Sequence, residues 1–89
     1  MANIRDLKKD INYVLGDIIE AVYVWELHNP DKDTKKSEAI IDEAISTFDD
    51  LIAKVNDKQV EDRKSHLKAV NAELEEKGKG LIDKINALG

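Results

Sequence analysis

The chain has 89 residues, no cysteine and a formal net charge of −5. This length fits one domain with one core, which we place over residues 1–89, and the lack of cysteine excludes disulfide staples. The acidic balance disfavours binding to the phosphate backbone of a nucleic acid. Because His28 and His66 are the only histidines, we also expect no zinc site with four cysteine and histidine ligands.

The first predicted helix covers residues 4–28, with Asn3 as its expected N-cap. Its apolar residues recur at spacings of three and four, which is the period of an amphipathic helix. This stripe consists of Ile4, Leu7, Ile11, Val14, Leu15, Ile18, Ala21, Val22 and Trp25.

The same helix carries a second apolar face, opposite the first and interrupted by Glu20. Its members are Tyr13, Gly16, Tyr23, Val24 and Leu27. A helix of a free-standing three-helix bundle needs one wide apolar face, so a second face indicates packing on two sides. We therefore interpret it as a candidate interface, in a homodimer or with a partner helix, where Gly16 would allow close approach. The alternative is an ordinary surface with scattered apolar residues.

The second predicted helix covers residues 34–55, after a loop that contains Pro30. Asp33 or Thr34 is expected to cap it. Its apolar residues again repeat at three and four, and they are Ile40, Ile41, Ala44, Ile45, Phe48, Leu51, Ile52 and Val55.

The third predicted helix covers residues 57–88, after a turn at Asn56 and Asp57. Its stripe consists of Val60, Leu67, Val70, Leu74, Leu81, Ile85 and Leu88. Gly78 and Gly80 should weaken a helix, but the apolar residues on both sides of them keep one phase, which predicts a continuous helix. Such a helix would extend about 10 Å beyond the first. Its last two turns would overhang the bundle and either cover the end near Trp25 and Pro30 or pack against another chain.

Two short connections between long helices predict an all-α, antiparallel up-down-up three-helix bundle with a long third helix. The apolar stretch near the N-terminus is interrupted by polar residues, so we expect neither a signal peptide nor a membrane-spanning helix. Together with the absence of cysteine, this favours a cytoplasmic protein.

Trp25 and His28 lie one turn apart at the end of the first helix and are weak candidates for a ligand site. The simpler interpretation is that Trp25 seals the bundle end and that His28 interacts favourably with the C-terminal end of the helix dipole. We expect no cofactor.

Asp62 and His66 are spaced i, i+4 and could in principle ligate a metal. The Glu-x-x-His motifs of di-iron bundles are absent from the sequence, so an exposed ion pair is the preferred interpretation and no metal site is expected.

Basic residues do not point to nucleic acid. Arg63, Lys64 and Lys68 cluster near Lys58, but acidic residues are interleaved with them and no aromatic platform accompanies them. The run Lys77–Gly80 lacks the context of a phosphate-binding loop and could instead serve as a hinge.

An enzyme is not expected. Ser65 and His66 are neighbours on a helix and therefore point about 100° apart, which is unsuitable for a nucleophile and its base. Acidic pairs such as Glu75 and Glu76 lie on polar faces, where nothing desolvates them. The preferred hypothesis is a non-enzymatic module for self-association or protein–protein interaction. The alternative is a small regulatory domain that binds a small ligand or nucleic acid.

Overall fold

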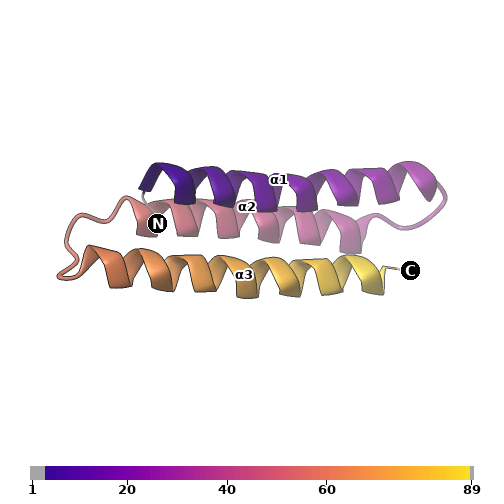
Figure 1. Cartoon of the computed structure of the whole chain (residues 1–89). Coiled ribbons are helices and arrows are strands. Elements are labelled where there is room, and N and C mark those ends of the chain that lie inside the picture. The colour runs from indigo at the N-terminus through magenta and orange to yellow at the C-terminus, as the bar shows by residue number, and fades with distance from the viewer. Residues whose placement is uncertain (1–3, 89) are drawn as a thin grey trace.

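The computed structural model describes residues 4–88, which form three α-helices and no strand. These are α1 (Ile4–His28), α2 (Lys35–Val55) and α3 (Arg63–Ala87). The chain runs up, down and up along a rod with extents of 50 × 20 × 17 Å (Figure 1). The predicted all-α antiparallel bundle is confirmed.

The core lies along the axis of the rod and takes residues from all three helices. Each helix contributes apolar side chains at spacings of three, four or seven, because these positions share one face of an α-helix. The buried set comprises Leu7, Ile11, Leu15, Ile18, Val22, Ile40, Ala44, Leu51, Val55, Leu67, Val70, Leu74 and Leu81.

The starts of the first two helices agree with the sequence within one residue. Asp33 provides the expected cap of α2, since its Oδ1 accepts a hydrogen bond of 2.9 Å from the backbone N–H of Lys35. Thr34 occupies the N-cap position without a side-chain bond to the backbone, and its hydroxyl donates to Glu38 Oε1 at 3.3 Å. Asn3, the expected cap of α1, lies outside the described residues.

The third helix begins later than predicted, at Arg63 instead of residue 57. Asp62 caps it from an extended backbone conformation, with φ −121° and ψ 98°, and its Oδ1 accepts a hydrogen bond of 3.2 Å from the Ser65 N–H. Asp57 instead holds a loop turn by accepting a bond of 3.0 Å from the Gln59 N–H. Since α1 and α3 both have 25 residues, the predicted long third helix and its overhang are wrong.

The helix α3 continues through Gly78 and Gly80, as the phase of its apolar residues predicts. Gly78 is buried, and a Cβ built on it would lie 3.2 Å from Val14 Cγ1. A Cβ on Gly80 would meet nothing within 4 Å. Gly78 therefore allows α1 and α3 to approach closely at this point.

Two residues of the predicted stripes are exposed instead of facing the core. Ala21 of α1 and Ile45 of α2 are exposed, the latter with 48 % of its surface accessible. Each helix of a three-helix bundle packs against only two neighbours, so residues at the edge of a wide stripe remain at the surface.

Candidate functional site

The side of α1 that faces away from the bundle carries four of the six exposed large hydrophobic side chains among the described residues. We call it the outer face of α1 and define it by Tyr13, Gly16, Tyr23, Val24 and Leu27, all of which are exposed. The accessible fractions are 58 % for Tyr13, 52 % for Tyr23, 44 % for Val24 and 80 % for Leu27. The core residues of α1 point the other way, so neither α2 nor α3 covers this face.

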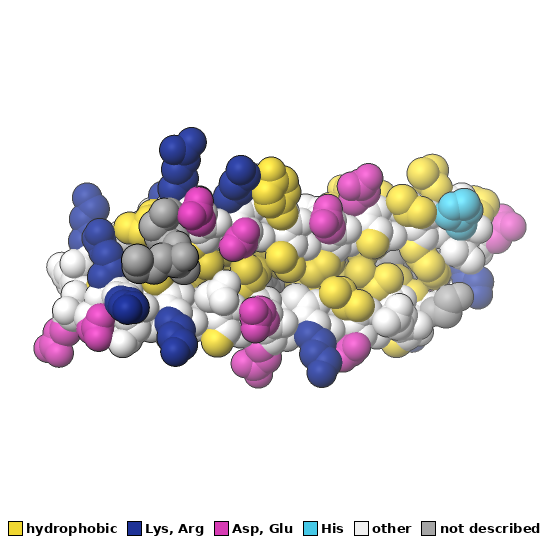
Figure 2. Space-filling view, in the orientation of Figure 1, with side chains coloured by type: hydrophobic (Ala, Val, Ile, Leu, Met, Phe, Trp, Pro, Cys, Tyr) yellow, Lys and Arg dark blue, Asp and Glu magenta, His cyan; other side chains and the backbone are white. Residues whose placement is uncertain are grey.

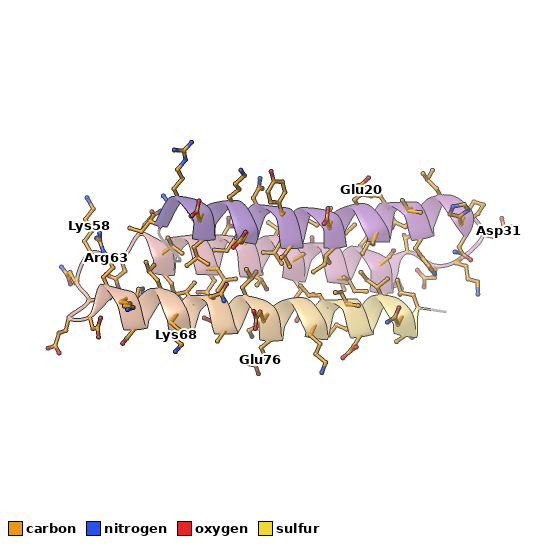
Figure 3. The ribbon with its side chains drawn as sticks, viewed as in Figure 1. Glu20, Asp31, Lys58, Arg63, Lys68 and Glu76 are labelled. Carbon is orange, nitrogen blue, oxygen red and sulfur yellow. The ribbon has the colours of Figure 1, made fainter. Side chains whose placement is uncertain are left out.

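Charged groups lie along the outer face. Lys9 Nζ stands 5.9 Å from the centroid of the Tyr13 ring, which is a cation–π geometry. Glu20 projects from the middle of α1 away from the other helices (Figure 3). Between these charges, a Cβ on Gly16 would meet nothing within 4 Å, so the face has an open notch at its centre.

Apolar surface also continues from the outer face into the groove between α1 and α3. Tyr13 lines this groove together with Val14, Gly78 and Ile82, and Ile82 is 48 % exposed. Further along, the groove is lined by Ala21 and other residues of both helices. Figure 2 shows hydrophobic side chains gathered along this groove and toward the end of the bundle where α1 ends.

The end of the bundle near Trp25 holds a shallow hollow. Trp25 is half-buried and lines a space of about 210 Å³ with Lys32, Asp33, Lys36 and Leu88. Its indole Nε1 is buried and has no hydrogen-bond partner. Because Leu88 lines the same space, Trp25 lies near the end of α3, as the sequence predicts.

His28 does not share this hollow. It is exposed and is not among the residues that line the space. Of these two candidate ligand-site residues, only Trp25 lines this hollow. The sequence does not indicate the adjacent groove between α2 and α3, which has a volume of about 480 Å³. Its lining is apolar at Ala39, Ile40, Ala87 and Leu88 and charged at Lys36, Glu43 and Lys84.

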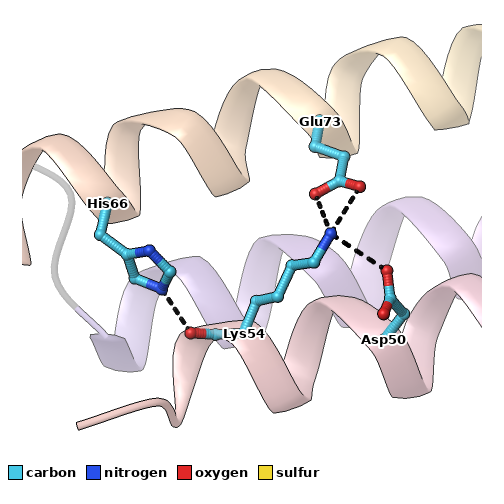
Figure 4. Close-up of polar contacts among 4 residues, drawn as sticks. All are labelled: Asp50, Lys54, His66 and Glu73. Atoms are coloured by element: carbon cyan, nitrogen blue, oxygen red, sulfur yellow. Dashed lines mark hydrogen bonds and ion pairs between the residues drawn. The ribbon is translucent and has the colours of Figure 1, made fainter. Parts of the chain in front are cut away.

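A polar cluster joins α2 to α3 near the 56–62 loop (Figure 4). Lys54 Nζ donates to both carboxylate oxygens of Glu73 at 2.8 Å and forms an ion pair of 3.3 Å with Asp50. These bonds, first to Glu73 and then to Asp50, raise the pKa of Lys54. His66 Nε2 donates to the Lys54 carbonyl oxygen at 2.6 Å. The cluster ties the two helices together.

Asp62 and His66 do not form the ion pair that their spacing favours, because each has another partner. Asp62 Oδ2 accepts a bond of 2.9 Å from the Ser65 hydroxyl, and this bond together with the Ser65 N–H lowers the pKa of Asp62. Within residues 4–88 no group of three or more potential ligands could hold a metal ion.

Two further contacts between helices were not predicted from the sequence. Ser37 is completely buried, and its Oγ lies 2.6 Å from Glu26 Oε2 and 2.9 Å from the Thr34 carbonyl oxygen. Lys84 Nζ donates to both oxygens of Glu43, at 2.8 and 2.5 Å. Ser37 lies three residues before buried Ile40, and this spacing is the only hint of its burial.

The predicted basic cluster is spread over the loop end of the bundle. Lys58 and Arg63 lie at that end, whereas Lys68 points outward from α3 (Figure 3). All of them, and Lys64, are exposed. The two tyrosines, which could stack on bases, lie on α1.

None of the three helices is both long and apolar enough to cross a membrane. Comparison with protein families, with curated proteins and with solved structures found no match to this chain. The outer face of α1 is the main candidate for a functional surface.

Proposed function

We propose that this chain is a non-enzymatic helical interaction module that binds another helix through the outer face of α1. One observation carries the proposal. Among the described residues, six large hydrophobic side chains are exposed, and four of them lie on this one face. The cysteine-free composition supports a cytoplasmic setting for such a module.

The chemistry of the face suits a helix as partner. Covering apolar surface contributes about 25 cal/mol per Å², so a row of exposed Tyr, Val and Leu side chains gains most from an extended partner. Tyrosine is enriched in protein interfaces, because its ring is apolar while its hydroxyl remains hydrogen-bonded. The notch at Gly16 allows a second helix axis to approach closely in the middle of the row.

Introducing a negative charge on the outer face of α1 tests this proposal. We expect Tyr23→Glu and Leu27→Glu to abolish association in sedimentation velocity while helicity by circular dichroism is retained. Ile45→Glu is the matched control, because Ile45 is 48 % exposed but lies on α2. Association that survives both α1 variants, or that fails equally in the control, contradicts the assignment of this face.

A second candidate function, binding of a small anionic ligand, is favoured by the hollow beside Trp25. Lys32 and Lys36 line the hollow and carry the donors that a carboxylate or phosphate needs, Asp33 lines it as well, and the buried indole N–H of Trp25 has no partner. Trp25 is the only tryptophan, so its fluorescence reports on this hollow alone. Saturable quenching by a carboxylate or phosphate compound supports the candidate, and a flat response across carboxylates, phosphates and oligonucleotides contradicts it.

A further inference from the structure

The hollow beside Trp25 and the groove between α2 and α3 are neighbouring parts of one concave surface. Lys36 and Leu88 line both of them. Figure 1 shows why the two helices meet there, since α2 begins and α3 ends at the same end of the rod. The groove has a volume of about 480 Å³, and small-molecule sites in proteins occupy roughly 300 to 1,000 Å³. The groove is therefore large enough for a ligand with an apolar part.

The groove follows the line along which α2 and α3 pack. Its residues on α2 share one face of the helix at positions i, i+3, i+4 and i+7, and they are Lys36, Ala39, Ile40 and Glu43. At 1.5 Å per residue, this row covers about 10 Å of α2. The small side chains of Ala39 and Ala87 leave room between the helices, and Ile40 and Leu88 supply apolar surface. This shape suits an unbranched alkyl chain.

The charges around the hollow and the groove are complementary to a single negative charge. One positive charge is in excess locally, although the whole chain has a net charge of −5, and the charged lining residues are Lys32, Asp33, Lys36, Glu43 and Lys84. Both acidic residues already have partners, because Glu43 accepts a bond of 2.8 Å from Lys84 Nζ and Asp33 accepts one from the backbone of α2. Within residues 4–88 the side chains of Lys32 and Lys36 form no ion pair. Their two ammonium groups are thus available to an anion.

We infer that the hollow and the groove together bind a single-chain amphiphile with a carboxylate head, namely a free medium-chain fatty acid. The carboxylate lies between the ammonium groups of Lys32 and Lys36, and the alkyl chain lies in the groove against Ile40 and Leu88. The inference rests on the second candidate function, since it uses the same two lysines. It adds the apolar part of the ligand and the surface that receives it.

Both parts of the ligand are needed for useful affinity. A bare carboxylate would meet two exposed ammonium groups in water, where an ion pair contributes little free energy. An alkyl chain gains free energy with each methylene group that it removes from water. Because Lys36 lines both the hollow and the groove, one molecule can place its head in the first and its chain in the second.

Calorimetric titration of the full chain with butanoate, hexanoate, octanoate and decanoate tests the inference. All four are used below the concentrations at which they form micelles. The affinity is expected to rise about two- to fourfold with each added methylene group, according to how fully the groove covers it. Octanol, which lacks the charge, should bind more weakly than octanoate. The fluorescence of Trp25, the only tryptophan, should change in the same titrations.

Two pairs of variants locate the ligand. Lys36→Gln should weaken octanoate binding several-fold, whereas Lys35→Gln makes the same change of charge at an exposed neighbour that lines neither space and should have no effect. Ala39→Glu should block the groove with a repelling carboxylate. Ala53→Glu is its control, because Ala53 is an exposed alanine of the same helix outside the groove.

The results that overturn the inference are distinguishable from failure of the candidate function itself. Equal affinities for butanoate and decanoate reject the amphiphile but retain a small-anion site in the hollow. Absence of binding by every carboxylate rejects both. A chain-length dependence that is unchanged in Lys36→Gln and Ala39→Glu rejects the inference, because the alkyl chain then lies elsewhere on the protein.

Discussion

Gly78 of α3 lies so close to Val14 of α1 that a Cβ on the glycine would stand 3.2 Å from Val14 Cγ1. Gly80, two residues further along the same helix, faces open space. The pair separates two effects of a glycine in a helix, namely its conformational freedom and the room that it leaves for a neighbour.

Replacement of these glycines by alanine is therefore expected to give different results. Gly80→Ala should raise the free energy of unfolding by about 1 kcal/mol, because alanine is the better helix former. Gly78→Ala should gain less or lose stability, because the new methyl group presses on the stiff β-branched side chain of Val14. Urea denaturation at one fixed protein concentration measures both. Equal stabilisation by the two substitutions would show that the contact with Val14 is not restrictive.

Ser37 is expected to matter more than its small size suggests. Its hydroxyl is buried against the Glu26 carboxylate, so Ser37→Ala leaves a partly buried charged group without its donor. The expected loss is about 1 to 3 kcal/mol in the free energy of unfolding, measured by urea denaturation. Ser46→Ala, at an exposed position of the same helix, is the control and should change stability by less than about 0.5 kcal/mol. A loss no larger than that of the control would contradict the role given to this contact.

Asp62 should make the stability of the bundle depend on pH on the acid side. Its pKa is lowered in the folded chain by the Ser65 hydroxyl and N–H, so its contribution is present above the unfolded pKa of about 3.9 and is lost as pH falls through the folded value. The melting temperature of wild type should thus exceed that of Asp62→Ala at pH 7, and the gap should shrink below about pH 4. Asp62→Asn is the control, because asparagine also caps a helix but does not titrate. A gap that stays constant from pH 7 to pH 3 would exclude this carboxylate as the source.

The sequence predicts the bundle well where apolar periodicity decides the outcome. The stripe from Leu7 to Val22 predicts both the extent of α1 and the side that faces the core. The start of α3 is harder to predict from the sequence, because Asp57 and Asp62 are both good capping residues and Val60 continues the apolar pattern into the loop. Asp62 becomes the cap because its side chain reaches the Ser65 N–H, a detail of backbone geometry that periodicity does not encode.

The ion pairs between helices could not be predicted from the sequence. Lys54 and Glu73 are 19 residues apart, and Lys84 and Glu43 are 41 residues apart. Their pairing depends on how the packed helices are rotated and offset relative to one another. An exposed charged residue in the sequence does not indicate this rotation or offset. The outer face of α1 is the opposite case, since its apolar pattern is local and visible in the sequence.

Molar mass in solution tests self-association through α1 most directly. Light scattering behind a sizing column, at several protein concentrations, distinguishes one chain of 10.0 kDa from a pair of twice that mass. We predict the mass of the pair, which persists on moderate dilution in wild type and falls to that of one chain in Tyr23→Glu. A mass of 10.0 kDa for wild type at every concentration would contradict the account.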